Sequence, residues 1–278
     1  MGIFIDEVLA SYKTYLSIKY PGHLQLLEDR VRSNLDGVRF EAAMFSVART
    51  YNLNPQIAEV IGEGGVDFLC TSQGRQFLIE VTHCDTESVE KQSGLCDIPD
   101  GQPKFFSMVT DVLQRKAINK ARQMSSYPMP RILCIGATHS ASTILLGKHE
   151  VKWLLTSETK ISIPIGAPNA SVSQVTGLEE SVFFRFDKDG NVVPCRQSIS
   201  AILLVICDSD SCLFVGVLHP QPAYTFDIAD LPDIPFLRVT NWGNLDGRIQ
   251  TEWTIASPSE RRVRLDKIEV MDKELREK

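Results

Sequence analysis

Two acidic side chains in one short stretch, Asp67 and Glu80, are of the residue type that holds a divalent cation. They belong to residues 66–83, VDFLCTSQGRQFLIEVTH, in which two apolar, β-prone runs flank a polar turn. This pattern predicts an antiparallel hairpin with Gln73 and Gly74 as its two turn residues. Pairing outward from that turn places Asp67 opposite Glu80, so the two carboxylates come within reach of one cation.

Opposed carboxylates in a hairpin favour a magnesium site. Like charges directly opposite each other destabilise a sheet, and a divalent cation would offset that repulsion. Mg²⁺ characteristically takes one or two carboxylates together with waters and a phosphate. The simpler interpretation is a polar cap at Asp67 and a strand end in solvent at Glu80. Strand alternation places Glu80 and Thr82 on one face and turns Ile79 and Val81 to the other.

These residues also carry a family resemblance. Residues 65–69, GVDFL, and residues 79–82, IEVT, resemble the PD-(D/E)xK nuclease superfamily, whose pattern is Asp at a strand start and Glu-x-Lys on the next strand. Thr82 departs from this pattern, because the family has there a lysine that orients the attacking water or stabilises charge on the phosphate. Some branches of the superfamily resemble this chain in having Glu-x-Thr, with the lysine moved to the following helix.

A long amphipathic segment supplies two lysines that could replace the missing one. Residues 104–126 form the strongest predicted helix of the chain, with Lys120 in the middle of its apolar stripe and Lys116 at the edge. A lysine on an apolar face is rarely fully buried without a partner. One interpretation is that Lys120 reaches Asp67 and Glu80, with Lys116 as the second candidate. The other is that both side chains extend outward to water.

A third carboxylate lies on the helix predicted before the hairpin. Residues 38–51 place apolar side chains on one stripe, and Glu41 falls at the edge of that stripe. The resemblance implies that a glutamate at this position completes the acidic cluster, whereas the plain alternative is a boundary glutamate that points to water. The candidate catalytic residues are Glu41, Asp67, Glu80, Lys120, Lys116 and Thr82. Asp67, Glu80 and Glu41 are the candidate ligands of Mg²⁺ or Mn²⁺.

The remaining elements must hold this hairpin between helices. Amphipathic helices are expected at 3–18, 23–34 and 38–51. After the 104–126 helix, the apolar residues 131–138 predict a buried strand, parallel to the second hairpin strand because a helical crossover joins the two. This order predicts an α/β fold, and the resemblance implies its restriction-endonuclease-like form, a mixed central sheet flanked by helices.

The C-terminal part is expected to add strands to that core. Hairpins are predicted for residues 181–186 with 191–195, and for residues 198–208 with 211–220. Residues 224–258 are expected to be irregular, and the tail from Ser257 is expected to form a charged helix. We expect one nuclease-like domain over residues 1–278, with N-terminal helices at 1–57, an α/β core at 58–225 and a C-terminal extension at 226–278.

Composition restricts the function classes. The net charge of −6 argues against a protein that holds nucleic acid on a broad basic surface, but not against a local basic rim around a metal-loaded centre. No apolar run approaches membrane-spanning length and no signal peptide is visible, so no membrane partner is expected. Seven cysteines without zinc-like spacing, with Cys70, Cys134 and Cys207 expected as buried thiols, favour a cytoplasmic location.

Two functions remain open at this point. The first is a metal-dependent nuclease that hydrolyses phosphodiester bonds, with DNA favoured over RNA as its nucleic-acid partner. The second is a catalytically inactive nuclease-like fold that acts as a nucleic-acid-binding or protein-interaction module, as a homodimer or as a subunit of a larger complex. Thr82 and the acidic net charge motivate the second. The distance of Lys120 and Lys116 from the carboxylates discriminates between them.

Overall fold

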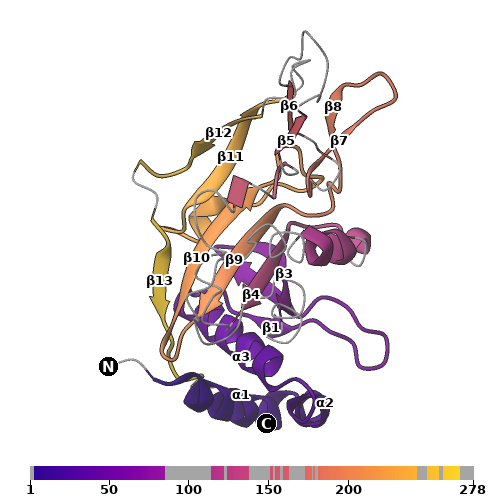
Figure 1. Ribbon diagram of the computed structural model, residues 1–278. Coiled ribbons are helices and arrows are strands. Elements are labelled where there is room, and N and C mark those ends of the chain that lie inside the picture. Colours follow the sequence, from indigo (N-terminus) through magenta and orange to yellow (C-terminus); the bar gives the residue numbers. More distant parts are fainter. Residues whose placement is uncertain are drawn as a thin grey trace.

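A computed structural model of the protein describes residues 3–84, 114–121, 124–137, 181–242, 249–256 and 259–269, with shorter stretches between 151 and 178. Within these residues the fold is mixed α/β, a large sheet flanked by helices (Figure 1). The polar segment 84–103 and the first half of the helix predicted at 104–126 lie almost entirely outside the described residues. Residues 114–121 are helical, as predicted.

Three helices open the chain, close to where the apolar periodicity predicts them. They are α1 (Ile5–Lys19), α2 (Pro21–Val31) and α3 (Leu35–Thr50). Proline suits the first position of a helix, since its fixed φ is helical and its missing N–H would have no partner there. This explains why α2 starts at Pro21, before the expected position. The side chain of Asn34 accepts a hydrogen bond from the Gly37 amide and caps α3.

Nine of the described strands build one mixed sheet. In spatial order these are β1 (Gln56–Ile57), β2 (Phe68–Ser72), β3 (Arg75–His83), β4 (Arg131–Ala137), β9 (Ala201–Cys207), β10 (Ser211–Leu218), β11 (Phe236–Asn241) and β12 (Gln250–Trp253), with β13 (Arg261–Arg264) on β10. Strands β3, β4 and β9 are parallel, whereas β2–β3 and β9–β10 are antiparallel pairs. The predicted order of helix, hairpin, helix and parallel strand is confirmed.

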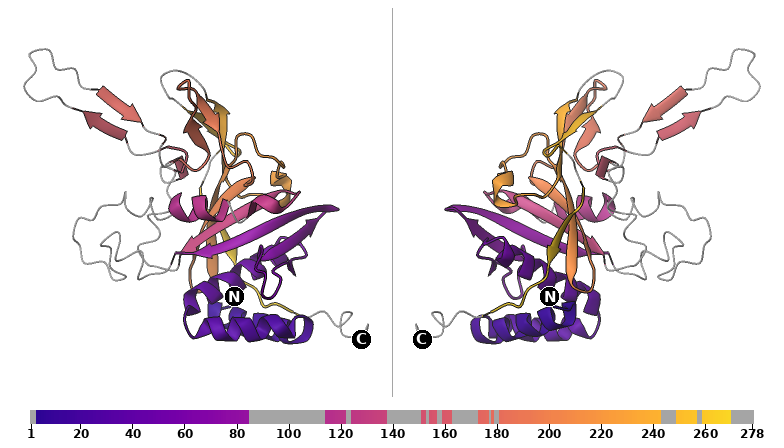
Figure 2. Two further views of the ribbon diagram at one scale, coloured as in Figure 1. Left: turned by 90° about the vertical axis from the view of Figure 1, so that its right-hand side faces the viewer. Right: turned by 90° about the vertical axis from the view of Figure 1, so that its left-hand side faces the viewer.

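Two smaller hairpins lie outside this sheet. One pairs β5 (Thr159–Ser162) with β6 (Ser173–Thr176), and the other pairs β7 (Phe184–Phe186) with β8 (Val192–Pro194). The second hairpin confirms the pairing predicted for residues 181–186 and 191–195. The β5–β6 hairpin projects away from the sheet (Figure 2).

The hairpin register is the one that the sequence predicts. Phe68 pairs with Ile79 and Ser72 pairs with Arg75, which leaves a two-residue turn. The turn residues Gln73 and Gly74 both have positive φ, 49° and 78°. Positive φ at both central positions is the turn geometry whose twist matches that of antiparallel strands. Asp67 therefore lies just before the first paired residue of β2.

Alternation along the strands divides the core into two faces. On one face, side chains such as Phe68, Ile79 and Cys134 pack against α1 and α3. On the other, side chains such as Leu78 and Leu133 pack against the helix of residues 114–121. Helices α1–α3 lie together at one end of the molecule, and the 114–121 helix lies apart from them (Figure 2). The β2–β3 hairpin thus lies between two helical layers.

Three expectations about the C-terminal half are wrong. Residues 224–258 contain the strands β11 and β12, which alternate too briefly to stand out in the sequence. The tail predicted as a helix contains β13, because its residues pair with the edge of β10. Cys207 is not a buried thiol, since the β9–β10 pairing places it opposite Cys212, to which it is disulfide-bonded. Cys70 and Cys134 are buried free thiols, as predicted.

One glycine allows α3 to pack closely on the sheet. A Cβ at Gly136 in β4 would overlap the ring of Phe40, the residue before Glu41. Overpacking of this kind destabilises a protein by about 1–3 kcal/mol. We therefore expect Gly136→Ala to lower the free energy of unfolding by about that amount in urea unfolding. Adding Phe40→Leu should recover part of the loss, and an unchanged stability of Gly136→Ala would contradict this packing.

Candidate active site

Asp67 is fixed between two strands at the point where β2 begins. Its backbone carbonyl accepts a hydrogen bond from Ala58 at 2.9 Å, just beyond β1. Its side-chain Oδ2 accepts one from the amide of Val81 in β3 at 2.6 Å. The second carboxylate oxygen, Oδ1, has no hydrogen-bond partner among the described residues. Asp67 is therefore oriented by one oxygen and can offer the other to a ligand.

Glu80 and Lys120 form the central contact of the site. The Nζ of Lys120 lies 2.5 Å from Oε1 of Glu80, whose side chain is 2% exposed. The other oxygen of Glu80, Oε2, is buried and has no hydrogen-bond partner among the described residues. A buried carboxylate oxygen without a partner is rare in proteins. The contact confirms that Lys120 reaches the hairpin, and it excludes the interpretation of Glu80 as a strand end in solvent.

Glu41 is buried beside the site but is already held by two other side chains. Tyr12 of α1 donates its hydroxyl to Oε1 at 3.1 Å, and Arg30 of α2 lies 2.8 Å from Oε2. The interpretation of Glu41 as a boundary residue pointing to water is therefore wrong, since only 8% of the residue is exposed. Glu41 lines the same small cavity as Asp67. Because both of its carboxylate oxygens already have partners, it is not open for a direct bond to a ligand.

A fourth carboxylate, Glu59, joins the cluster without having been predicted. It lines, with Glu41 and Asp67, a cavity of about 10 Å³, which has room for about one water molecule. Glu59 follows β1, and β1 pairs with β2 over two residues. A strand of that length leaves no periodic pattern in a sequence. Glu63, four residues further along the same loop, is exposed and does not join the cluster.

The other two predicted residues are placed differently. Lys116 donates from Nζ to the backbone carbonyl of His83 at 2.6 Å, one helical turn away from the Lys120 contact. It holds the end of β3 and is not brought to the carboxylates. Thr82 is half-buried in β3, where it pairs with Ile135 of β4. By alternation Thr82 shares the face of Glu80, as expected.

The chain was compared with protein-family models, with curated proteins and with solved structures. No match was found in any of the three. The chemistry of the site must therefore be argued from its own geometry.

Mutual repulsion and burial make the acidic cluster unfavourable by itself. Burial raises the pKa of Asp67 well above its usual range, and the negative charges of Glu80 and Glu41 raise it further. Burial also raises the pKa of Glu80, while Lys120 acts in the opposite direction. The pKa of Glu41 is raised by burial as well, although Arg30 and Tyr12 partly oppose this. The cluster therefore holds more buried negative charge than Lys120 and Arg30 balance.

A raised carboxyl pKa has a defined effect on stability. The folded protein holds the Asp67 proton more tightly than the unfolded chain, so between the two pKa values the folded state binds more protons. The stability that this difference contributes is present below the ordinary pKa of about 4 and is lost as the pH rises through the raised value. This pH dependence of stability is opposite to that of a carboxylate whose charge is stabilised by a salt bridge.

Asp67→Asn is therefore expected to stabilise the protein in the absence of divalent cations. The amide oxygen of the substituted side chain can still accept from Val81, while the buried negative charge is gone. We expect a gain of about 0.5–2 kcal/mol near neutral pH, a typical value for a single stabilising substitution. The gain should shrink as the pH falls toward about 4. Urea unfolding of both proteins in EDTA over this pH range measures it, and a gain that grows at low pH would contradict the argument.

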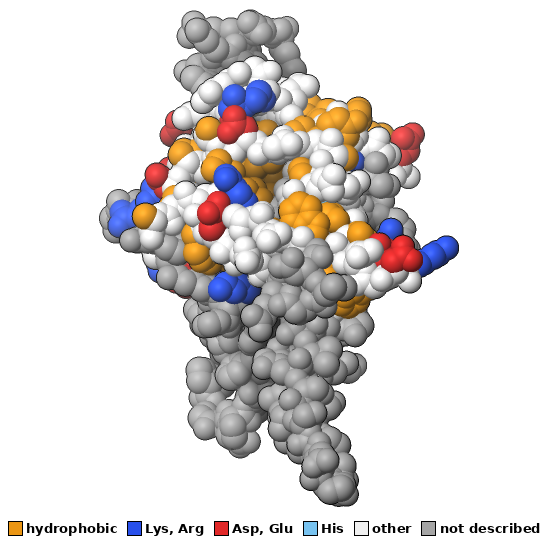
Figure 3. Space-filling view, turned by 90° about the horizontal axis from the view of Figure 1, so that it is seen from above, with side chains coloured by type: hydrophobic (Ala, Val, Ile, Leu, Met, Phe, Trp, Pro, Cys, Tyr) orange, Lys and Arg blue, Asp and Glu red, His pale blue; other side chains and the backbone are white. Residues whose placement is uncertain are grey.

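Three further observations concern the described residues. In the part of the chain that the structure describes, no group of three or more His, Cys, Asp or Glu side chains is arranged to hold a metal ion. None of the described helices is both long and apolar enough to cross a membrane. The face seen from above in Figure 3 mixes hydrophobic, basic and acidic side chains. The described residues of that face show no broad basic surface.

Proposed function

We propose that the protein is a metal-dependent nuclease of the restriction-endonuclease-like fold, which hydrolyses phosphodiester bonds in DNA or RNA. The observation that carries the proposal is the contact between Lys120 and Glu80. It supplies, from the following helix, the positive charge that Thr82 cannot supply on the strand. The order of α3, the β1–β2–β3 strands, the 114–121 helix and β4 supports the same assignment.

The residues present fit Mg²⁺ or Mn²⁺ at Asp67 and Glu80. Each offers a carboxylate oxygen that has no hydrogen-bond partner among the described residues, Oδ1 of Asp67 and Oε2 of Glu80. Mg²⁺ characteristically binds through one or two carboxylates and keeps several waters. A set of two protein ligands therefore suffices, and Glu41 would act through the water that the small cavity can hold. When bound, the ion would polarise the phosphate and lower the pKa of a bound water.

The protein side chains would orient the substrate and balance charge. Lys120 would stabilise negative charge that develops on the phosphate, since preorganised positive groups act strongly in a site of low polarity. The amide of Val81 keeps Asp67 in one orientation. Tyr12 and Arg30 hold Glu41 and so keep a third negative charge at the edge of the site. DNA remains the favoured substrate, as proposed from the resemblance.

The first test is cleavage itself. Purified protein should cut single-stranded or double-stranded DNA, or RNA, in buffer with Mg²⁺ or Mn²⁺, and should lose this activity in EDTA. Labelled oligonucleotides and plasmid DNA separate endonuclease from exonuclease products. Cleavage that persists in EDTA would exclude the proposed chemistry.

The second candidate is a nuclease-like fold without catalysis, which serves as a nucleic-acid-binding or protein-interaction module. Two observations favour it, namely that Glu41 is occupied by Arg30 and Tyr12, and that no three-ligand metal group occurs among the described residues. Failure to cleave any of these substrates, together with absence of metal binding, would favour this candidate. A homodimer or a larger complex would then be sought by measuring the mass in solution and by partner capture.

A further inference from the structure

A second concave region lies away from the acidic cluster, between the β7–β8 hairpin and the chain that leads into β9. It has a volume of about 470 Å³ and is lined by Leu178, Ser181, Phe184, Arg185, Phe186, Cys195 and Arg196. Small-molecule sites occupy about 300–1,000 Å³ and combine apolar walls with a few placed polar groups. This pocket has that composition, and it has two guanidinium groups but no carboxylate among its described lining residues.

Hydrogen bonds hold the Arg196 guanidinium in position in the basic wall of the pocket. Nη1 of Arg196 donates to the carbonyls of Ser181 and Val182 at 3.1 and 2.9 Å and to Sγ of Cys195 at 3.1 Å. A guanidinium has five N–H donors, so these contacts, all made by one nitrogen, fix the group and leave donors for a ligand. The guanidinium of Arg185 has no hydrogen bond or ion pair with the described residues, although its backbone pairs with Val193 in the hairpin.

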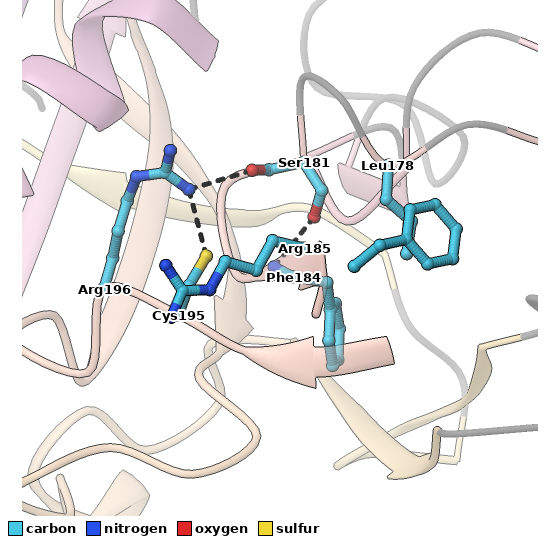
Figure 4. Close-up of a pocket in the computed structure, with 7 residues that line it drawn as sticks. Leu178, Ser181, Phe184, Arg185, Cys195 and Arg196 are labelled. Atoms are coloured by element: carbon cyan, nitrogen blue, oxygen red, sulfur yellow. Dashed lines mark hydrogen bonds between the residues drawn. The ribbon is translucent and has the colours of Figure 1, made fainter. Parts of the chain in front are cut away.

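The two positive charges act at the same place. Figure 4 shows both guanidinium groups near Cys195, with Leu178 on the other side of the pocket. Burial raises the pKa of the Cys195 thiol, and Arg196 and Arg185 both act to lower it, which agrees with this placement. An anionic group would therefore bind at the Cys195 wall.

The opposite part of the pocket is apolar and aromatic. Phe186 is 48% exposed, one of the few large hydrophobic side chains in the described part of the chain with so much surface in contact with water. Leu178 and Phe184 are buried and support this wall. Aromatic faces of this kind stack nucleobases irrespective of sequence, and arginine contributes to such binding. A phosphate at the arginines and a base on Phe186 would match the two walls.

The pocket lies on the same side of the sheet as the helix that carries Lys120. The hydroxyl of Ser198 donates to the carbonyl of Ala121 at 2.8 Å, and Ala121 follows Lys120 in the helix. The pocket residues Leu178 and Phe184 belong to the same core face as Ala121 and Leu78. A strand bound in the pocket would therefore lie on the face of the sheet from which Lys120 approaches Glu80.

We propose that this pocket binds one nucleotide unit, with the phosphate on Arg185 and Arg196 and the base against Phe186. The identity of the ligand as part of a nucleic-acid strand rests on the proposed function. The binding chemistry does not, because none of the pocket residues belongs to the acidic cluster.

Binding of a labelled single-stranded oligo-dT of about 12 nucleotides, measured by fluorescence anisotropy in EDTA, tests the proposal without cleavage or metal. Phe186→Ala should weaken binding at least about fivefold, the low end of one stacked base. Arg185→Gln should weaken binding and reduce the slope of log affinity against log salt by about 0.7, the value for one phosphate contact on a single strand. Lys188→Gln is the matched control, since Lys188 is an exposed charge on the turn of the same hairpin.

The outcomes separate the possibilities. Competition by thymidine monophosphate as strong as by unlabelled oligo-dT would identify a free nucleotide as the ligand, and competition by the strand alone would identify nucleic acid. Affinity unchanged in both pocket variants, or lowered equally by Lys188→Gln, would overturn the proposal. Thermal unfolding of each variant shows whether a loss of binding reflects a loss of folding. If the protein cleaves no substrate but the oligonucleotide still binds in the pocket, the proposed nuclease function is rejected and the proposed nucleotide site stands.

Discussion

Asp67→Asn is expected to lower the rate of Mg²⁺-dependent cleavage by at least about 100-fold, since it removes a carboxylate ligand and the charge that would hold the ion. The side chain remains the same size and can still accept from Val81. The reduction should therefore come from lost metal chemistry and not from lost folding. Cleavage rates at saturating Mg²⁺, with unfolding measured in parallel, separate these two causes.

The matched control for this variant is Glu63→Gln. Glu63 is an exposed carboxylate in the loop that leads to Asp67, so its substitution removes the same charge from the same segment. We expect it to change the rate less than about twofold, because charges in solvent contribute little. Equal cleavage rates for Asp67→Asn and wild type would contradict a role of the Asp67–Glu80 carboxylate pair in cleavage.

Lys120→Gln is expected to reduce the cleavage rate constant at saturating substrate by about 10²–10³, the usual effect of removing one preorganised group that stabilises charge in the transition state. Metal affinity should stay the same or increase, because a positive charge next to Glu80 is removed. The variant thus differs from Asp67→Asn, in which metal affinity falls. Steady-state kinetics together with metal titration measures both quantities.

Lys116→Gln, on the same helix, is the control for Lys120→Gln. Its amine lies one turn from that of Lys120 and contacts the backbone carbonyl of His83. We expect a rate within about fivefold of wild type, since a single neutral-acceptor contact is modest in energy. A loss in Lys116→Gln as large as in Lys120→Gln would assign the second lysine to the site instead.

The sequence was sufficient to predict the hairpin, and it offered the approach of Lys120 to the carboxylates as one of two interpretations. Two apolar runs around Gln73 and Gly74 allow one register, because a shift by one residue would turn every side chain to the wrong face. Helical spacing then placed Lys120 in the middle of the apolar stripe. The structure confirms both features through the pairing of Phe68 with Ile79 and the contact with Glu80.

The partners of Glu41 could not be predicted from the sequence. Tyr12 lies on α1 and Arg30 on α2, and their approach to Glu41 depends on how three helices pack, which periodicity does not specify. Glu59 was missed because β1 is two residues long. The tail was assigned to a helix because its charge pattern fits one, whereas pairing with β10 determines the conformation of β13. In each case a contact distant in sequence decided the structure.

The bond between Cys207 and Cys212 is a further case of this kind. Apolar neighbours indicated a buried thiol at Cys207, but the β9–β10 register brings the two sulfur atoms together. Disulfides are rare in reducing compartments, so this pair does not support the cytoplasmic location favoured from the cysteine pattern. The location therefore stays a prediction.

The measurement that tests the central claim most directly is titration of Mg²⁺ and Mn²⁺ into wild type and Asp67→Asn by calorimetry. Two carboxylate oxygens without hydrogen-bond partners among the described residues, on Asp67 and Glu80, predict one binding event in wild type that is lost or weakened at least about tenfold in the variant. Absence of binding to wild type at millimolar metal, with or without an oligonucleotide, or equal binding to both proteins, would contradict a cation site on this hairpin.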